Sequence, residues 1–209
     1  MLLPDNILED IDAPAVSLPS GLDAPEPRED IFSAKARKAW HEAGGAEARC
    51  DFAPNRHGIH PRGAWFIHRW KRSVKGRTLS EIKADEEMIG FFADGLAPLI
   101  SAVLGPDLAK GGFALVTTPP RRHKERNFGE LMAADIARRL GVRFYKGCAV
   151  ARSRERIGAV YDPGNIPEEP NVIVVDDIVT TGSTFTSMKE LLYRFGKRCI
   201  FFAGINNST

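Results

Sequence analysis

The chain has 209 residues, of which 43% are hydrophobic and 27% are charged, and its formal net charge is +2 at pH 7. These values are ordinary for a soluble globular protein and suit one domain plus extensions. The sequence shows no signal peptide and no apolar run of the roughly 18 residues that a membrane span needs, so we expect no membrane partner. Three widely spaced cysteines, odd in number, indicate reduced thiols in a cytoplasmic protein.

The charge is unevenly distributed along the chain. Residues 1–30 hold eight acids and one base, which leaves the remaining residues with a formal charge of about +9. Five of the 14 prolines lie in the same segment, so we expect an irregular, acidic, proline-rich arm over residues 1–30. A basic body suits a polyanionic ligand, either a sugar pyrophosphate or a nucleic acid, although an ordinary solvated surface explains the charge equally well.

After this arm, helix and strand patterns follow one another. We expect a helix over 31–43, an apolar helical stripe over 82–103, a strand over 113–117, an amphipathic helix over 128–140, a strand over 172–175, a helix over 185–195 and a strand over 199–203. Pro98 lies inside the second of these helices, where it should kink or break it. Alternating strands and helices predict an α/β fold with a parallel sheet flanked by helices.

The most informative segment is VIVVDDIVTTGST, residues 172–184. Its four apolar residues indicate a buried parallel strand, and Asp176 and Asp177 follow where we expect that strand to end. A turn then leads into a helix, whose free N–H groups and dipole favour an anion. The predicted phosphate cradle comprises Thr180, Thr181, Gly182, Ser183 and Thr184.

Two acids beside an anion site limit the ligand that fits there. Carboxylates would repel a phosphate, but they suit neutral hydroxyl groups, so the segment fits a ribose 5-phosphate. The patterns GxxxxGK[ST] and GxGxxG are absent, so neither a nucleoside-triphosphate P-loop nor a dinucleotide fold is indicated. The alternative is an ordinary strand, turn and helix with two solvated aspartates.

The segment resembles the signature of type I phosphoribosyltransferases, which bind phosphoribosyl pyrophosphate (PRPP). The resemblance implies that Asp176 and Asp177 are the catalytic acids that hold the ribose hydroxyls, and that residues 180–184 hold the 5-phosphate. It also implies a type I phosphoribosyltransferase-like core, which we place at residues 111–209, and an N-terminal helical hood or extension, which we place at residues 31–110.

A basic loop follows the strand over 113–117 and should face the same cleft, because it leaves the carboxyl end of a parallel strand. In type I phosphoribosyltransferases this loop binds the pyrophosphate. The resemblance therefore implies a pyrophosphate loop that contains Thr118, Pro119, Arg121, Arg122, Lys124 and Arg126. The alternatives are a solvated basic loop and a nucleic-acid-binding patch.

The stretches ERNFGELMAADIARRLGV and FIHRWKRSVKG narrow the resemblance to the competence protein F (ComF) branch of these enzymes, over about residues 64–205. Three positions depart from that family's pattern, namely Asn127, Gly129 and Glu130. Relatives in that branch often begin with paired CxxC zinc motifs, whereas this chain retains only Cys50, His57 and His60. Three potential ligands do not complete a tetrahedral site, so we expect no protein-bound metal.

Type I enzymes also carry a mobile lid between the helix over 128–140 and the signature strand. By position the lid arginines are Arg152, Arg154 and Arg156, and the segment 161–163 is its turn, although solvated loop arginines explain the pattern equally well.

The resemblance implies a pentosyltransferase that moves a phosphoribosyl group from PRPP to a nitrogen acceptor, while pyrophosphate leaves with Mg²⁺. Thr180 stands where 6-oxopurine transferases have an aspartate, which argues against hypoxanthine or guanine as the acceptor. Two alternatives remain, a non-catalytic regulator that binds PRPP or a nucleotide, and a ComF-like protein of DNA uptake. We favour a small-molecule partner over nucleic acid, and the sequence is compatible with an oligomer.

Overall fold

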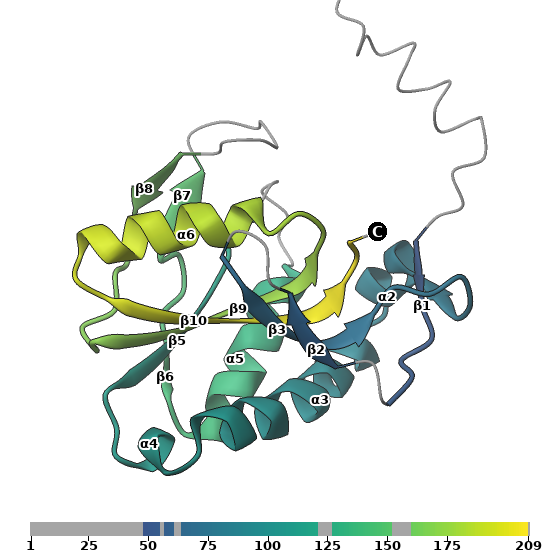
Figure 1. Ribbon diagram of the computed structural model, residues 1–209, viewed down its shortest axis with the longest axis horizontal. Coiled ribbons are helices and arrows are strands. Elements are labelled where there is room, and N and C mark those ends of the chain that lie inside the picture. The colour runs from purple at the N-terminus through teal and green to yellow at the C-terminus, as the bar shows by residue number, and fades with distance from the viewer. Residues whose placement is uncertain (1–47, 55–56, 61–63, 121–126, 152–159, 209) are drawn as a thin grey trace, which may run out of the picture. The chain divides into compact units, whose positions relative to one another are not determined.

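The computed structural model describes residues 48–54, 57–60, 64–120, 127–151 and 160–208. The predicted acidic arm over 1–30 and the predicted helix over 31–43 lie outside these residues. Figure 1 shows a central sheet with helices on both of its faces. This arrangement confirms the predicted α/β class with a mostly parallel sheet flanked by helices.

The central sheet has six strands in the order β2-β3-β10-β9-β5-β6. Only β2 runs antiparallel to its neighbour, and the other adjacent pairs are parallel. The core of β9 is buried on both faces, which is typical of a parallel strand covered on both sides. The strands comprise β2 (Gly58–His60), β3 (Phe66–Lys71), β5 (Phe113–Thr117), β6 (Arg143–Phe144), β9 (Asn171–Val179) and β10 (Arg198–Asn206).

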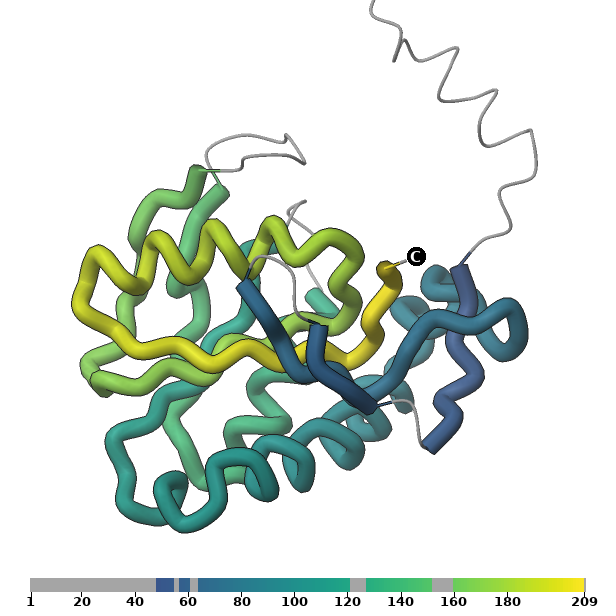
Figure 2. Tube along the Cα trace, viewed as in Figure 1, coloured from purple at the N-terminus to yellow at the C-terminus, as the bar shows by residue number. Residues whose placement is uncertain are grey.

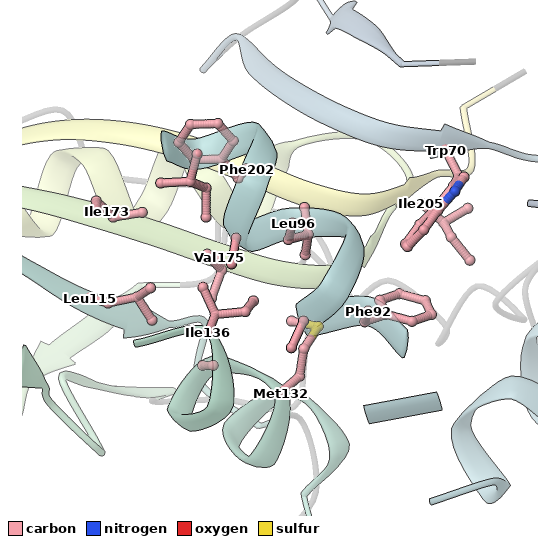
Figure 3. Close-up of a cluster of buried hydrophobic side chains, with 14 of the residues drawn as sticks. Trp70, Phe92, Leu96, Leu115, Met132, Ile136, Ile173, Val175, Phe202 and Ile205 are labelled. Carbon is pink, nitrogen blue, oxygen red and sulfur yellow. The ribbon is translucent and has the colours of Figure 1, made fainter. Parts of the chain in front are cut away.

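Two long helices cover one face of the sheet and a third covers the other (Figure 1). The first face carries α3 (Glu87–Leu104) and α5 (Phe128–Leu140), and the second carries α6 (Ser183–Arg194). Successive residues of β9 alternate between the two hydrophobic clusters, as the twofold repeat of a strand requires. Figure 3 shows the cluster under α3 and α5, which includes Trp70, Phe92, Leu96, Leu115, Met132, Ile136, Ile173, Val175, Phe202 and Ile205.

The smaller elements lie outside the central sheet. They comprise α2 (Leu79–Ala84), α4 (Pro106–Ala109), the pair β1 (Arg49–Cys50) and β4 (Arg77–Thr78), and the pair β7 (Ala149–Ala151) and β8 (Tyr161–Pro163). A capping box fixes the start of α2, since Thr78 and Glu81 satisfy each other's backbone N–H groups. At its other end, Arg77 forms an ion pair of 2.8 Å with Asp85. These contacts hold a helix of only six residues in one orientation.

The local patterns predict two elements to the residue, since β5 and α5 have the expected bounds. The expected break at Pro98 is wrong, because α3 continues through it to Leu104. Proline removes one helical hydrogen bond, but Leu96, Ala97 and Ile100 are buried on either side of it. Tertiary packing of this apolar face keeps the helix continuous.

The segment that the sequence analysis places in a hood shares its core with the rest of the sheet. Strand β3 pairs in parallel with β10, for example through Ile67 and Phe202, and α3 packs against the same sheet. The boundary expected at residue 110 therefore does not separate two hydrophobic cores. By length and composition α3 could cross a membrane, since its mean hydropathy is 1.5, and the expectation that the chain has no such apolar run is wrong in this respect. Its six buried residues pack in the sheet's core instead.

Candidate functional site

A cavity of about 610 Å³ lies where β5 and β9 separate. The pairing of β5 with β9 ends at Thr117 and Val175, whereas β10 accompanies β9 as far as Val179. The cavity is lined by residues that follow β5, the start of α5, the second half of β9 and the region of α2. Ligands of α/β proteins bind at this end of a parallel sheet, where neighbouring strands diverge.

Both predicted acids line this cavity, but they lie within a strand rather than after it. Strand β9 continues to Val179 because β10 still pairs with it there. The Asp177 side chain is only 9% exposed, and its Oδ2 lies 2.7 Å from the Nζ of Lys83. The N–H of Ile178 donates to Oδ1 of Asp177 at 2.7 Å, so the carboxylate is held from two sides.

Asp176 experiences a different environment from its neighbour. Its Oδ1 accepts a hydrogen bond of 2.9 Å from the N–H of Asp177. Burial raises the pKa of Asp176 to about 8, and the negative charge of Asp177 adds to this increase, while Lys83 opposes it. One strand thus presents a carboxylate held by a cation beside a carboxyl group whose pKa is raised to about 8.

The predicted phosphate cradle forms the turn into α6. Gly182 has φ of 75° at the N-cap, a left-handed conformation that glycine adopts without strain, and it has no side chain to cap the helix. Thr180 and Thr184 line the cavity of the acids. Thr181 and Ser183 are hydrogen-bonded to each other at 3.0 Å and line an adjacent cavity of about 560 Å³. The structure thus places Thr180 and Thr184 in the cavity of the acids, and Thr181 and Ser183 in the adjacent one.

Part of the predicted pyrophosphate loop reaches the same cavity. Thr118 and Pro119 line it, and the hydroxyl of Thr117 donates to the carbonyl of Val175 at 3.0 Å, which joins the ends of β5 and β9. The basic members of the loop, Arg121, Arg122, Lys124 and Arg126, lie outside the described residues.

Helix α5 begins directly after this loop. Its cap is Asn127, whose Oδ1 accepts from the N–H of Gly129 at 3.1 Å, and both residues line the cavity. The first turns of α5 and α6 therefore both contribute residues to one cavity. Helix α5 follows β5, and α6 follows β9, the strand that carries the two acids. Both termini favour negative charge.

The predicted lid differs from the structure where the two can be compared. The segment Tyr161–Pro163, expected as a turn, is strand β8 and pairs with β7 in an antiparallel ribbon. Three consecutive residue pairs match between the two strands, from Ala149 with Pro163 to Ala151 with Tyr161, so extended pairing replaces the turn. Tyr161 lines both cavities. The lid arginines, Arg152, Arg154 and Arg156, lie outside the described residues.

Two residues of the site were not found from the sequence, Lys83 and Asn207. Lys83 lies on α2, and no motif connects this short helix with the distant signature segment. Asn207 directly follows β10, so its position after a parallel strand was a usable signal. Figure 2 shows the end of β10, beside the label C, on the same side of the molecule as α2, and Asn207 lines the cavity together with residues of α2.

The donor set of the cavity suits a metal ion only together with a ligand. Within the described ranges, no group of three or more His, Cys, Asp and Glu side chains is placed to hold a metal. The two carboxylates of β9 offer oxygen atoms, which Mg²⁺ prefers, but Lys83 already contacts one of them. Further oxygen atoms must therefore come from a substrate and from water.

No protein-family model matches the chain, and no curated protein matches it. Among solved structures it is similar to orotate phosphoribosyltransferase from Aeropyrum pernix, with 21% identity over 78% of this chain and 75% of that chain and a TM-score of 0.41. It is also similar to adenine phosphoribosyltransferase from Leishmania tarentolae, with 15% identity over 85% and 89% of the two chains and a TM-score of 0.42. A third similar structure is a hypoxanthine phosphoribosyltransferase from Staphylococcus aureus, with 15% identity over 56% of this chain and 73% of that chain and a TM-score of 0.38. At these levels the likeness by itself assigns neither a family nor a reaction.

Proposed function

We propose that this protein is a type I phosphoribosyltransferase that binds PRPP and transfers its phosphoribosyl group to a nitrogen acceptor. The observation that carries the proposal is the position of Asp176 and Asp177 in one cavity with two helix N-termini. Acids that suit ribose hydroxyls thus lie between two places that favour phosphate groups. PRPP has this sequence of groups, a 5-phosphate, a ribose and a pyrophosphate.

The size and the walls of the cavity support a ligand of this kind. Its volume of about 610 Å³ falls within the range of roughly 300–1,000 Å³ that is usual for small-molecule and cofactor sites. The N-cap of α6 is Gly182, which has no side chain to cap the helix, and although the N–H of Ser183 donates to the hydroxyl of Thr181 at 3.4 Å, the helix dipole at this terminus suits the 5-phosphate. The segment from Thr117 to Asn127 is then left for the pyrophosphate.

The protein's part in such a transfer is to position the sugar and to balance charge. As the bond from the ribose to pyrophosphate breaks, positive charge develops on the sugar ring, which the carboxylates of β9 stabilise. Asp177 is preorganised for this task because Lys83 and the N–H of Ile178 hold it. The pKa of Asp176 is raised in the free protein, and a positive charge that develops beside this group would lower that pKa and favour loss of its proton. Mg²⁺ bound with the substrate would neutralise the leaving pyrophosphate.

Calorimetric titration with PRPP in the presence of Mg²⁺ tests the binding step, and a pyrophosphate-release screen over nucleobases tests the transfer. We expect Asp177→Asn to weaken PRPP binding or turnover by at least about tenfold, the loss of one charge-assisted hydrogen bond. Asp107→Asn is the matched control, because it removes the same charge from an exposed ion pair on α4. Failure of PRPP to bind at millimolar concentration, or equal binding by wild type and Asp177→Asn, would overturn the proposal.

A non-catalytic regulator that binds the same ligand is the second candidate, and the ion pair of Lys83 with Asp177 favours it. Lys83 offsets the negative charge of Asp177, which leaves less charge to stabilise a cationic sugar ring but still allows the ribose hydroxyls to bind. Mg²⁺-dependent PRPP binding without pyrophosphate release from any acceptor would support this candidate.

Within the superfamily we infer the ComF-like branch, on the resemblance of the segments around Phe66–Lys71 and Phe128–Leu140. A role in DNA uptake would give strongly salt-dependent DNA binding that survives substitution of Gly182 or Thr184. Loss of DNA binding in the same variants would instead tie it to the phosphate cradle.

A further inference from the structure

Lys83 brings a positive charge to the cavity of the two acids. Its Nζ lies 2.7 Å from Oδ2 of Asp177, whose side chain is only 9% exposed. Among the described residues that line this cavity, Lys83 is the only lysine, arginine or histidine. The carboxyl groups along the same lining belong to four residues, Asp85, Glu86, Asp176 and Asp177. One cation thus faces an otherwise acidic set of described side chains.

Helix α2 holds Lys83 in place from a rigid base. The preceding residue, Ile82, is fully buried in the hydrophobic cluster under α3 and α5, and the capping box fixes the start of the helix. Beyond its last turn, Asp85 is paired with Arg77 at 2.8 Å, so this acid already has a cation of its own. The ammonium group of Lys83 is therefore directed to β9 by the packing of the helix that carries it.

A metal ion on the same carboxylate would compete with Lys83. Mg²⁺ binds oxygen atoms at about 2.0–2.1 Å, so an ion on Oδ2 of Asp177 would lie next to the ammonium group. The other oxygen, Oδ1, already accepts from the N–H of Ile178 at 2.7 Å. Two cations at contact distance repel each other strongly in a partly buried site. Neutral hydroxyl groups carry no such penalty, so the ion pair admits a ribose and opposes a metal ion.

We propose that Lys83 takes the place of a metal ion at the acids, so that the protein binds its ligand with one divalent cation, carried by the pyrophosphate, and excludes a second from Asp177. The part that concerns the ligand rests on the proposed phosphoribosyl transfer, whereas the exclusion of metal from the free protein does not. Lys83 is a positioning residue in this scheme, because it acts through the carboxylate that it holds. The cation requirement of the site is then set by a helix outside the signature segment.

Mn²⁺ binding to the free protein tests the exclusion directly. Mn²⁺ takes the same oxygen ligands as Mg²⁺, and electron paramagnetic resonance measures the unbound ion. We expect Lys83→Met to bind Mn²⁺ at least about tenfold more tightly than wild type, because the repulsion of an adjacent unit charge is removed. Adding Asp177→Asn to Lys83→Met should abolish this gain. Lys83→Gln should behave like Lys83→Met, and it serves if the methionine variant does not fold.

Two controls separate charge at the acids from loss of any lysine. Lys110→Met removes an exposed lysine whose Nζ lies 2.7 Å from Oδ1 of Asp107. Lys83→Arg keeps the positive charge. Both should bind Mn²⁺ like wild type. The inference is overturned if wild type binds Mn²⁺ at millimolar concentration and Asp177→Asn removes that binding, if Lys83→Met and Lys83→Gln gain no affinity, or if Lys110→Met gains as much as they do.

The number of metal ions in the PRPP complex tests the remaining part. With PRPP and protein at equal concentration, Mn²⁺ titration should give one bound ion per wild-type complex and two per Lys83→Met complex. Equal numbers in the two complexes would overturn the inference. If wild type binds no PRPP, the proposed function fails, while Mn²⁺ binding to the free protein still decides whether Lys83 excludes a metal ion.

Discussion

Substitution of Gly204 by alanine should destabilise the protein, although it adds only one methyl group. Gly204 lies in β10, and a Cβ built there would lie 2.4 Å from Cε1 of Phe92 and 2.7 Å from the carbonyl oxygen of Asp177. Atoms do not approach this closely, so the ring or the strand must move. The ring has little room, because Phe92 is fully buried and packs against Trp70 and Phe128.

The magnitude follows from overpacking of a tight core. Inserting a methyl group into such a site lowers the free energy of unfolding by about 1–3 kcal/mol. For a chain of this length each kcal/mol lowers the melting temperature by about 2–4 °C. Urea unfolding followed by circular dichroism measures the change. Because the carbonyl oxygen of Asp177 is one of the atoms that the new methyl group would displace, we also expect weaker PRPP binding by Gly204→Ala.

Gly90→Ala is the matched control for this prediction. Gly90 lies inside α3, and a Cβ built there would have no atom within 4 Å. Alanine favours a helix interior over glycine, so this variant should gain about 0.5–1 kcal/mol of unfolding free energy and bind PRPP like wild type. If Gly204→Ala unfolds at the same urea concentration as wild type, or at a higher one, the reasoning on close packing is refuted.

Three further predictions concern charge and thiol chemistry. Lys83→Met should lower the free energy of unfolding, measured in urea, by about 1 kcal/mol, a modest value because the lysine is half exposed. The same substitution should raise the pKa of Asp176 further, because Lys83 lowers it; an NMR pH titration that shows a lower pKa would contradict this role of Lys83. Because the folded protein raises the pKa of Asp176 from 3.8 to about 8, it favours the protonated form, so the free energy of unfolding should fall as pH rises from about 4 to about 8. Asp176→Asn should flatten this dependence in urea titrations at a series of pH values, and an unchanged slope would exclude Asp176 as its source. Burial raises the pKa of Cys148 to about 12 and that of Cys199 to about 11, so both thiols should react slowly with Ellman's reagent at pH 8. All three cysteines should react rapidly in urea-unfolded protein, and a rapid reaction of Cys148 and Cys199 in native protein would disprove this.

Local sequence patterns predicted the elements whose signals lie within one stretch of chain. The bounds of α5 follow from its apolar spacing, with Asn127 and Gly141 at its ends. The acids of β9 and the turn after them were found for the same reason, because the whole motif spans thirteen consecutive residues.

The features that the sequence did not predict depend on contacts between distant segments. Strand β9 is longer than its apolar run because β10 pairs with its polar end. The helix across Pro98 persists because the sheet buries one of its faces. Lys83 belongs to the site only because the fold brings α2 to β9, and neither its neighbours nor its spacing records that approach.

The two aspartates of β9 also complete the backbone of the strand that carries them. Where β5 leaves β9, the amide of Asp177 bonds to the side chain of Asp176, and the amide of Ile178 bonds to the side chain of Asp177. Alanine at either position would orphan a peptide donor, whereas asparagine keeps an acceptor there, so alanine scanning would confound misfolding with lost recognition. A descendant that had abandoned its ligand would still need aspartate or asparagine at both positions, so the pattern of the motif would outlive the chemistry.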